Sequence, residues 1–135
     1  MSGAVSVVAE DFEQELVIRW SIGQAETWPE LELLHAIPNG GFRSKRTAAL
    51  LKRTGVKSGV PDLSLPVARG GFHGLYIEMK RTDGGRVSQE QKAWHVALRA
   101  QGHMVAVCCG HEEAIAVIRD YLASDGCPDL VEAAA

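Results

Sequence analysis

Two acidic residues and a lysine interrupt two short apolar segments near the middle of the chain. The segments are VPDLSL (60–65) and GLYIEMK (74–80), and the polar residues are Asp62, Glu78 and Lys80. Because strand side chains alternate between two faces, the Leu, Ile and Met residues can enter one core while the three polar residues emerge on a common surface. Converging carboxylates repel each other, and a divalent cation such as Mg²⁺ or Mn²⁺ removes that repulsion. A neighbouring ammonium group could then hold a water and neutralise the charge that develops on a phosphoryl group.

A helix expected at 10–22 carries further acids. Its apolar arc includes Val17 and Trp20; Glu13 falls inside this arc and Glu10 lies at its edge. An acid that faces a core is costly unless it is paired, so either residue could reach water at the helix end or bind a metal. The strand acids have a simpler alternative as well, a surface ion pair between strands worth roughly a few tenths of a kcal/mol.

The elements that must position these residues follow an order typical of an α/β fold. Helices are expected at 10–22, 44–55, 88–102 and 112–122, and strands at 31–37, 60–65, 74–80 and 104–109. Gly55 and Gly102 end two of the helices, and Ser88 and Gln91 form a capping box at the start of another. The order αβαββαβα predicts a mixed β-sheet flanked by helices on both faces.

The 135 residues are expected to form a single domain. We expect a flexible N-terminus at 1–9, a folded domain at 10–122 and a loosely ordered tail at 123–135. The chain starts without the pattern of a signal peptide, and no apolar run approaches the roughly 20 residues of a membrane helix. Its three cysteines form no disulfide or zinc pattern. A cytoplasmic protein with reduced thiols and no membrane contact is therefore predicted.

Basic residues concentrate in the middle of the chain although its net charge is -3. No acid occurs from Asn39 to Pro61. The basic residues of this segment are Arg43, Lys45, Arg46, Lys52, Arg53 and Lys57. Such a segment is expected of a surface that binds nucleic-acid phosphates, and a solvated helix face would show the same pattern.

Several blocks of the sequence resemble the VRR-NUC branch of the PD-(D/E)xK nucleases. The blocks are IPNGGFR, LLKRTGVKSGVPD, LYIEMKR and VSQEQKAWHVALRAQGHMVAV, and an E-x-x-x-Q pattern formed by Glu10 and Gln14 precedes them. The resemblance runs from about residue 10 to residue 122. The chain is similar to the small stand-alone members found in phages and bacteria.

The resemblance implies a restriction-endonuclease-like fold and metal-dependent hydrolysis of phosphodiesters. It implies that Asp62 and Glu78 bind Mg²⁺ or Mn²⁺ together with the carbonyl of Met79, and that Lys80 is the catalytic lysine. Gln91 matches a glutamine of the family's site, with its role in the capping box as the alternative. The helical metal ligand is Glu10 by the E-x-x-x-Q pattern, with Glu13 as the alternative because it fits the apolar arc better.

The expected substrate is branched DNA. No zinc finger, helix-turn-helix or basic zipper that could read bases is present in the sequence, so selection by DNA shape at four-way junctions, flaps or forks is predicted. The resemblance to small members similar to Holliday junction resolvases supports this. A junction offers two equivalent cutting sites, which predicts a two-fold homodimer with Ile18, Ile22 and Trp28 as interface candidates. The alternative is a non-catalytic nucleic-acid-binding module that retained the nuclease fold.

Overall fold

The computed structural model describes residues 2–39 and 44–125, and for residues 2–8 the backbone alone. Its elements are α1 (Ser2–Gly23), the 3₁₀ helix η1 (Pro29–Leu33), β1 (His35–Ala36), α2 (Lys45–Arg53), β2 (Leu63–Leu65), β3 (Leu75–Lys80), α3 (Gln89–Ala100), β4 (Met104–Cys109) and α4 (His111–Ala123). The predicted order αβαββαβα is confirmed, with η1 as an addition.

The strands form one mixed sheet in the order β1-β2-β3-β4. β2 pairs antiparallel with both β1 and β3, with Leu63 opposite Ile77. β3 pairs in parallel with β4, with Leu75 opposite Met104. A parallel pair needs a long crossover connection, and α3 supplies it. This topology leaves β4 at an edge of the sheet.

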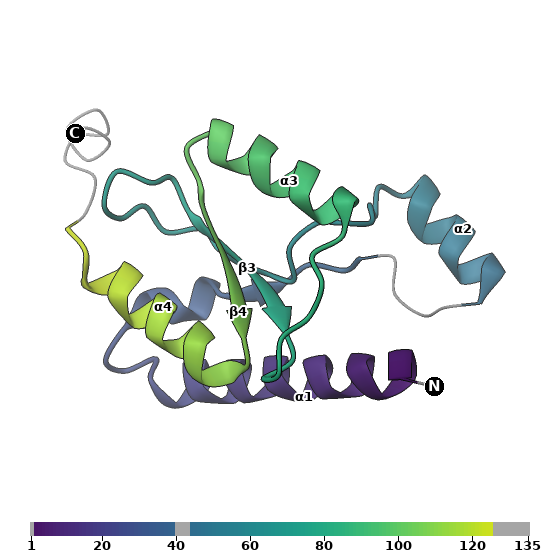
Figure 1. Cartoon of the computed structure of the whole chain (residues 1–135). Helices are drawn as coiled ribbons and strands as arrows, with labels where there is room; N and C mark the ends of the chain where they lie inside the picture. The colour runs from purple at the N-terminus through teal and green to yellow at the C-terminus, as the bar shows by residue number, and fades with distance from the viewer. Residues whose placement is uncertain (1, 40–43, 126–135) are drawn as a thin grey trace.

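Helices cover both faces of β3 (Figure 1). On one face Ile77 and Met79, each 1% exposed, pack into a core with Val17 of α1 and Ile118 of α4. On the other face α3 lies over the sheet, as Figure 1 shows. A strand covered on both faces has buried residues along its whole length, and here that includes its polar residues.

The helix α2 projects from the sheet instead of packing on it, as Figure 1 shows. None of its residues is buried. Its start is fixed by Ser44, whose hydroxyl accepts the backbone N–H of Thr47 at 3.2 Å. Gly55 follows the helix with a φ of 106°, a left-handed conformation that glycine adopts without strain. The predicted helix at 44–55 is therefore present, but as an arm.

Three elements differ from the predictions by more than two residues at one end. The first helix starts at Ser2, so the backbone of residues 2–9, expected to be flexible, is helical. The strand expected at 31–37 is divided into η1 and the short β1, because Pro29 favours the first turn of a helix. The strand expected at 60–65 begins only at Leu63. Of the predicted tail, residues 126–135 lie outside the described residues.

Among the helices that the structure describes, none is long and apolar enough to cross a membrane.

Candidate active site

Asp62 lies in a bend directly before β2, where two hydrogen bonds hold its side chain. Its Oδ2 accepts the backbone N–H of Met79 at 2.7 Å, and its Oδ1 accepts Nδ2 of Asn39 at 3.1 Å. The pairing of β2 with β3 ends where Leu63 lies opposite Ile77. The next N–H of β3 on the β2 side belongs to Met79, and the Asp62 carboxylate accepts it in place of a backbone carbonyl of β2. The carboxylate is thereby fixed beside the end of β3.

Glu78 is a buried acid, with 2% of its surface exposed. Its Oε2 accepts Nε2 of Gln91 at 3.1 Å. Its Oε1 has no hydrogen-bond partner and faces Nε2 of His95 at 3.6 Å. Burial, followed by the charges of Arg99 and Lys80, lowers the pKa of His95. A neutral imidazole therefore lies behind Glu78.

The expectation that Glu78 and Lys80 emerge on an exposed surface is wrong. The two side chains do share the face opposite the core, but Lys80 is only 5% exposed. The period of the strand determines which residues share a face, and it does not determine whether a helix covers that face. Here the first turns of α3 cover it.

Gln91 connects the acid to the lysine. Its amide group donates to Glu78, and its carbonyl oxygen accepts Nζ of Lys80 at 3.2 Å. The same oxygen accepts the backbone N–H of Ser88 at 2.9 Å, and the Ser88 hydroxyl accepts the N–H of Gln91 at 3.1 Å. The predicted capping box is therefore present, and it fixes the side chain that contacts Glu78 and Lys80.

The environment of Glu78, including the Asp62 carboxylate, strongly perturbs its pKa. Burial and then the neighbouring Asp62 carboxylate raise the pKa of Glu78 to about 9, and Lys80 opposes the shift only partly. Adjacent carboxylates in a site of low dielectric share a proton unless a cation neutralises them. At neutral pH the pair therefore favours an added positive charge.

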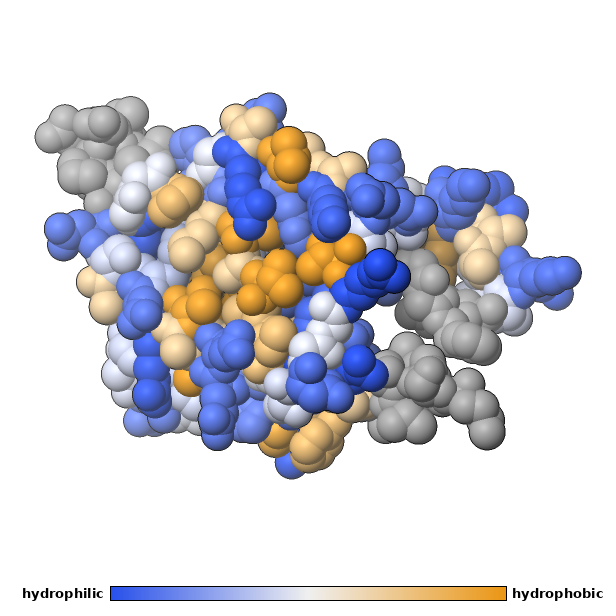
Figure 2. Space-filling model, in the orientation of Figure 1, coloured by the Kyte–Doolittle hydropathy of each residue, from blue (hydrophilic) through white to orange (hydrophobic). Residues whose placement is uncertain are grey.

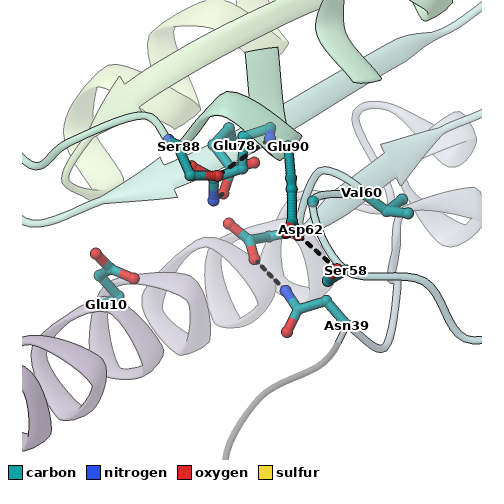
Figure 3. Close-up of a pocket in the computed structure, with 10 residues that line it drawn as sticks. Glu10, Asn39, Ser58, Val60, Asp62, Glu78, Ser88 and Glu90 are labelled. Carbon is teal, nitrogen blue, oxygen red and sulfur yellow. Dashed lines mark hydrogen bonds between the residues drawn. The ribbon is translucent and has the colours of Figure 1, made fainter. Parts of the chain in front are cut away.

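Glu10 lines the same cavity from α1. The cavity has a volume of about 290 Å³, and its wall is formed by Glu10, Asn39, Ser58, Gly59, Val60, Asp62, Glu78, Ser88, Glu90 and Gln91. Figure 3 shows Glu10 directed from the helix towards the side of the cavity where Asp62 and Glu78 lie. Burial raises the pKa of Glu10, while the Lys80 charge lowers it. In the described part of the chain, no three acidic, histidine or cysteine side chains are close enough to form a complete metal site.

Glu13 has a different environment. Its Oε2 accepts the backbone N–H of His111 at 2.6 Å and lies 2.6 Å from Nδ1 of the same residue. Although burial acts in the opposite direction, these hydrogen bonds lower the pKa of Glu13. Glu13 thus binds the N-terminus of α4 and is absent from the cavity wall that contains Glu10.

The cavity has donors that fit a divalent cation. The Glu78 carboxyl lines the cavity together with the Asp62 carboxylate, and its buried Oε1 atom has no hydrogen-bond partner. In a strand, the N–H and C=O of one residue point to the same side, so the Met79 carbonyl points to the side where its amide meets Asp62. Hard oxygen donors of this kind suit Mg²⁺ or Mn²⁺.

The predicted phosphate-binding residues lie on and after α2. Lys45, Arg46, Lys52, Arg53 and Lys57 are all exposed, and Arg43 lies outside the described residues. At 3.6 residues per turn, the four cations of α2 fall within an arc of about 120°. The loop that follows α2 is attached to α3, because the Ser58 hydroxyl donates to Oε2 of Glu90 at 2.5 Å. A single cationic face is thereby linked to the wall of the carboxylate cavity.

Four residues of this region were not predicted from the sequence: Asn39, Ser58, Glu90 and His95. His95 had a detectable signal, because it follows Gln91 by four residues and therefore lies on the same face of α3. Asn39 and Ser58 reach the cavity from loops, and no periodic pattern gives their position.

The chain is similar to known VRR-NUC proteins. The model of the VRR-NUC domain family matches residues 7–112. A solved structure described as a VRR_NUC domain protein superimposes with a TM-score of 0.74 and 32% sequence identity, over 87% of this chain and 91% of the other. Comparison with curated proteins gives no match.

Proposed function

The chain belongs to the VRR-NUC family, a family of nuclease-type hydrolases, and from that premise we propose that it is a metal-dependent, structure-selective DNA endonuclease. The observation that carries the proposal is the paired Asp62 and Glu78 carboxylates in an open cavity, connected through Gln91 to Lys80. A purely structural role gives no reason to bury Glu78 beside a second carboxylate that repels it.

Four groups would hold the cation, which we propose to be Mg²⁺ or Mn²⁺. Asp62, Glu78 and the Met79 carbonyl are the donors at the end of β3, and Glu10, which lines the same cavity from α1, would complete the set if a bound cation drew the three acids closer than they lie in this structure. A cation bound there would supply Lewis-acid activation of water and of the phosphoryl group. Gln91 and His95 would keep Glu78 oriented, since they contact its two oxygens.

Lys80 is the proposed catalytic lysine. Lys80 is only 5% exposed, so its ammonium group acts where water screens charge poorly. There it would orient the attacking water and stabilise the negative charge that develops on the phosphoryl oxygens. The water oxygen would form a bond to phosphorus and release a proton to solvent, the P–O3′ bond would break, and O3′ would take up a proton from solvent, so that the products carry a 5′-phosphate and a 3′-hydroxyl.

The cationic face of α2 would bind the DNA backbone. Phosphate contacts position DNA without reading its sequence. Together with the lack of a base-reading motif in the sequence, they favour cleavage selected by shape at four-way junctions, flaps or forks. Two equivalent cuts at a junction need two active sites, so we propose a homodimer. The free Cys108 and Cys109 fit a protein that works in the reducing cytoplasm.

The test is a cleavage assay on linear duplex, flap and four-way junction DNA of matched sequence. Each DNA is incubated with Mg²⁺, with Mn²⁺ or with EDTA. The expected result is cleavage of branched DNA that requires the cation and is lost in Asp62→Asn. Cleavage that persists in EDTA would refute the metal-dependent mechanism. DNA binding without cleavage under every condition would support the alternative of a non-catalytic module.

A further inference from the structure

The loop that follows α2 touches the first turn of α3 at a point with no room for a side chain. Gly59 has a φ of 89°, in the left-handed region that glycine adopts without strain. A Cβ atom added to it would lie 2.8 Å from the carbonyl carbon of Glu90 and 2.9 Å from its carbonyl oxygen. Because both atoms belong to the backbone of a helix, they cannot move aside as a flexible side chain would. Any other residue at this position would therefore push the loop away from α3.

A hydrogen bond stabilises the same contact. The hydroxyl of Ser58 donates to Oε2 of Glu90 at 2.5 Å, and Figure 3 draws this bond between the loop and the helix. A hydrogen bond to an ionised carboxylate is stronger than one between neutral groups. We call the contact formed by Ser58, Gly59 and Glu90 the α2–α3 joint.

The joint lies beside the proposed catalytic groups. Glu90 directly precedes Gln91, whose side chain donates to Glu78. In the other direction along the chain, Asp62 follows Gly59 by three residues. All the residues of the joint line the cavity that contains the two carboxylates. The joint is therefore part of the wall around the proposed metal site.

The chain between the joint and α2 is compact. The N–H of Val56 donates to the carbonyl of Leu51 at 2.9 Å, and the N–H of Gly55 donates to the carbonyl of Lys52 at 3.2 Å. These hydrogen bonds attach the start of the loop to the last turn of the helix. A support at Gly59 is thereby a support of α2 itself.

The helix α2 is not packed into the protein. None of its residues is buried, and in Figure 2 the surface at the place of α2 stands out from the rest of the molecule. Residues 40–43, which precede the helix, lie outside the described residues. In the part of the chain that the structure describes, the direction of the cationic face therefore depends on the α2–α3 joint.

This direction matters for a nuclease that binds phosphates without reading bases. Such contacts position the DNA, so the bond that is cut is the one that reaches the carboxylate cavity while α2 holds the backbone. A misplacement of about 1 Å between a substrate and the catalytic groups can lower the rate about 100-fold. The distance and angle between α2 and the cavity thus select the bond.

We propose that the α2–α3 joint holds α2 in a fixed orientation to the carboxylate cavity and thereby determines where DNA is cut relative to the phosphates that α2 binds. Gly59 is the positioning residue, and the hydrogen bond from Ser58 to Glu90 stabilises the contact. The role in cutting rests on the proposed function, whereas the orientation of α2 can be measured without metal or DNA.

The first experiment maps the cuts in end-labelled four-way junction and flap DNA at nucleotide resolution, with Mg²⁺. Gly59→Ala should move or spread the cuts by about one nucleotide or more. Its affinity for DNA should stay within about twofold of wild type, because the cations of α2 are unchanged. Ser58→Ala, which removes only the hydrogen bond, should give a smaller share of displaced cuts.

Gly71→Ala is the matched control. Gly71 lies in the loop between β2 and β3, and its φ of 87° is nearly that of Gly59. A Cβ atom added there has nothing within 4 Å, so the variant carries the same backbone strain without the clash. It should cut at the wild-type positions. Circular dichroism confirms that each variant is folded.

The second experiment measures residual dipolar couplings of the backbone amides by NMR, in EDTA and without DNA. In wild type and Gly71→Ala, the couplings of α2 should fit the same alignment as those of the sheet. In Gly59→Ala they should deviate from it, because α2 is reoriented or mobile.

Couplings of α2 that are averaged in the wild type, or that stay unchanged in Gly59→Ala, would overturn the proposal. So would cuts at the wild-type positions in both Gly59→Ala and Ser58→Ala. A wild type that cuts no DNA would refute the proposed function and, with it, the role of the joint in cutting. The couplings would then still decide whether the joint orients α2.

Discussion

Replacement of Glu78 by glutamine should make the metal-free protein more stable at mildly alkaline pH. The pKa of Glu78 is raised from 4.5 to about 9, chiefly by burial and then by Asp62. Between these values the folded state keeps a proton that the unfolded state has lost, so the wild type loses stability as pH rises. From about pH 5 to pH 8 the loss attributable to Glu78 is at most about 4 kcal/mol, at 1.36 kcal/mol per pKa unit. Glu78→Gln removes it because glutamine does not titrate.

The assay is urea unfolding of wild type and Glu78→Gln at both pH values in EDTA. The difference between the two proteins isolates Glu78 from the other titrating groups. Glu112→Gln is the matched control, since Glu112 is an exposed acid of α4 outside the cavity. Glu78→Gln should gain stability relative to wild type as pH rises. When Mn²⁺ replaces EDTA, it should stabilise only the wild type. If the difference in unfolding free energy between Glu78→Gln and wild type were the same at both pH values, Asp62 and Glu78 would not be a proton-sharing carboxylate pair.

Three further predictions separate catalysis, DNA binding and structure. Lys80→Ala should lower the cleavage rate at least about 100-fold, whereas Lys92→Ala, which replaces an exposed lysine of α3, should leave it unchanged. Equal rates for wild type and Lys80→Ala in gel-based cleavage assays would exclude the role of Lys80. Lys52→Glu combined with Arg53→Glu should weaken DNA binding and lower the slope of log K against log salt by about 2, measured by fluorescence anisotropy. Glu13→Gln should destabilise the protein by about 1–2 kcal/mol in thermal unfolding, because the start of α4 loses a charged acceptor. Weaker Mn²⁺ binding in that variant would contradict its structural role.

The local patterns of the sequence predicted much of the fold. The strand within 74–80, the capping box of Ser88 and Gln91 and the glycine after α2 each depend on a few neighbouring residues, and each is present in the structure. The burial of Glu78 could not be predicted in this way. It depends on the return of α3 over the sheet, which is a property of tertiary packing.

The choice between Glu10 and Glu13 shows the same limit. Both acids lie on the same side of α1 as Val17, seven and four residues before it, so the helical period does not separate them. What separates them is which element lies beside each residue. The N-terminus of α4 contacts Glu13, whereas the cavity at the end of β3 adjoins Glu10.

The most direct test of the proposed metal site is anomalous diffraction from crystals of the wild-type protein soaked in Mn²⁺. We predict a peak within coordinating distance of both the Asp62 and the Glu78 carboxylates, and its loss in crystals of Asp62→Asn. Well-ordered wild-type crystals with no peak between these two side chains, or with manganese bound only elsewhere, would contradict the account.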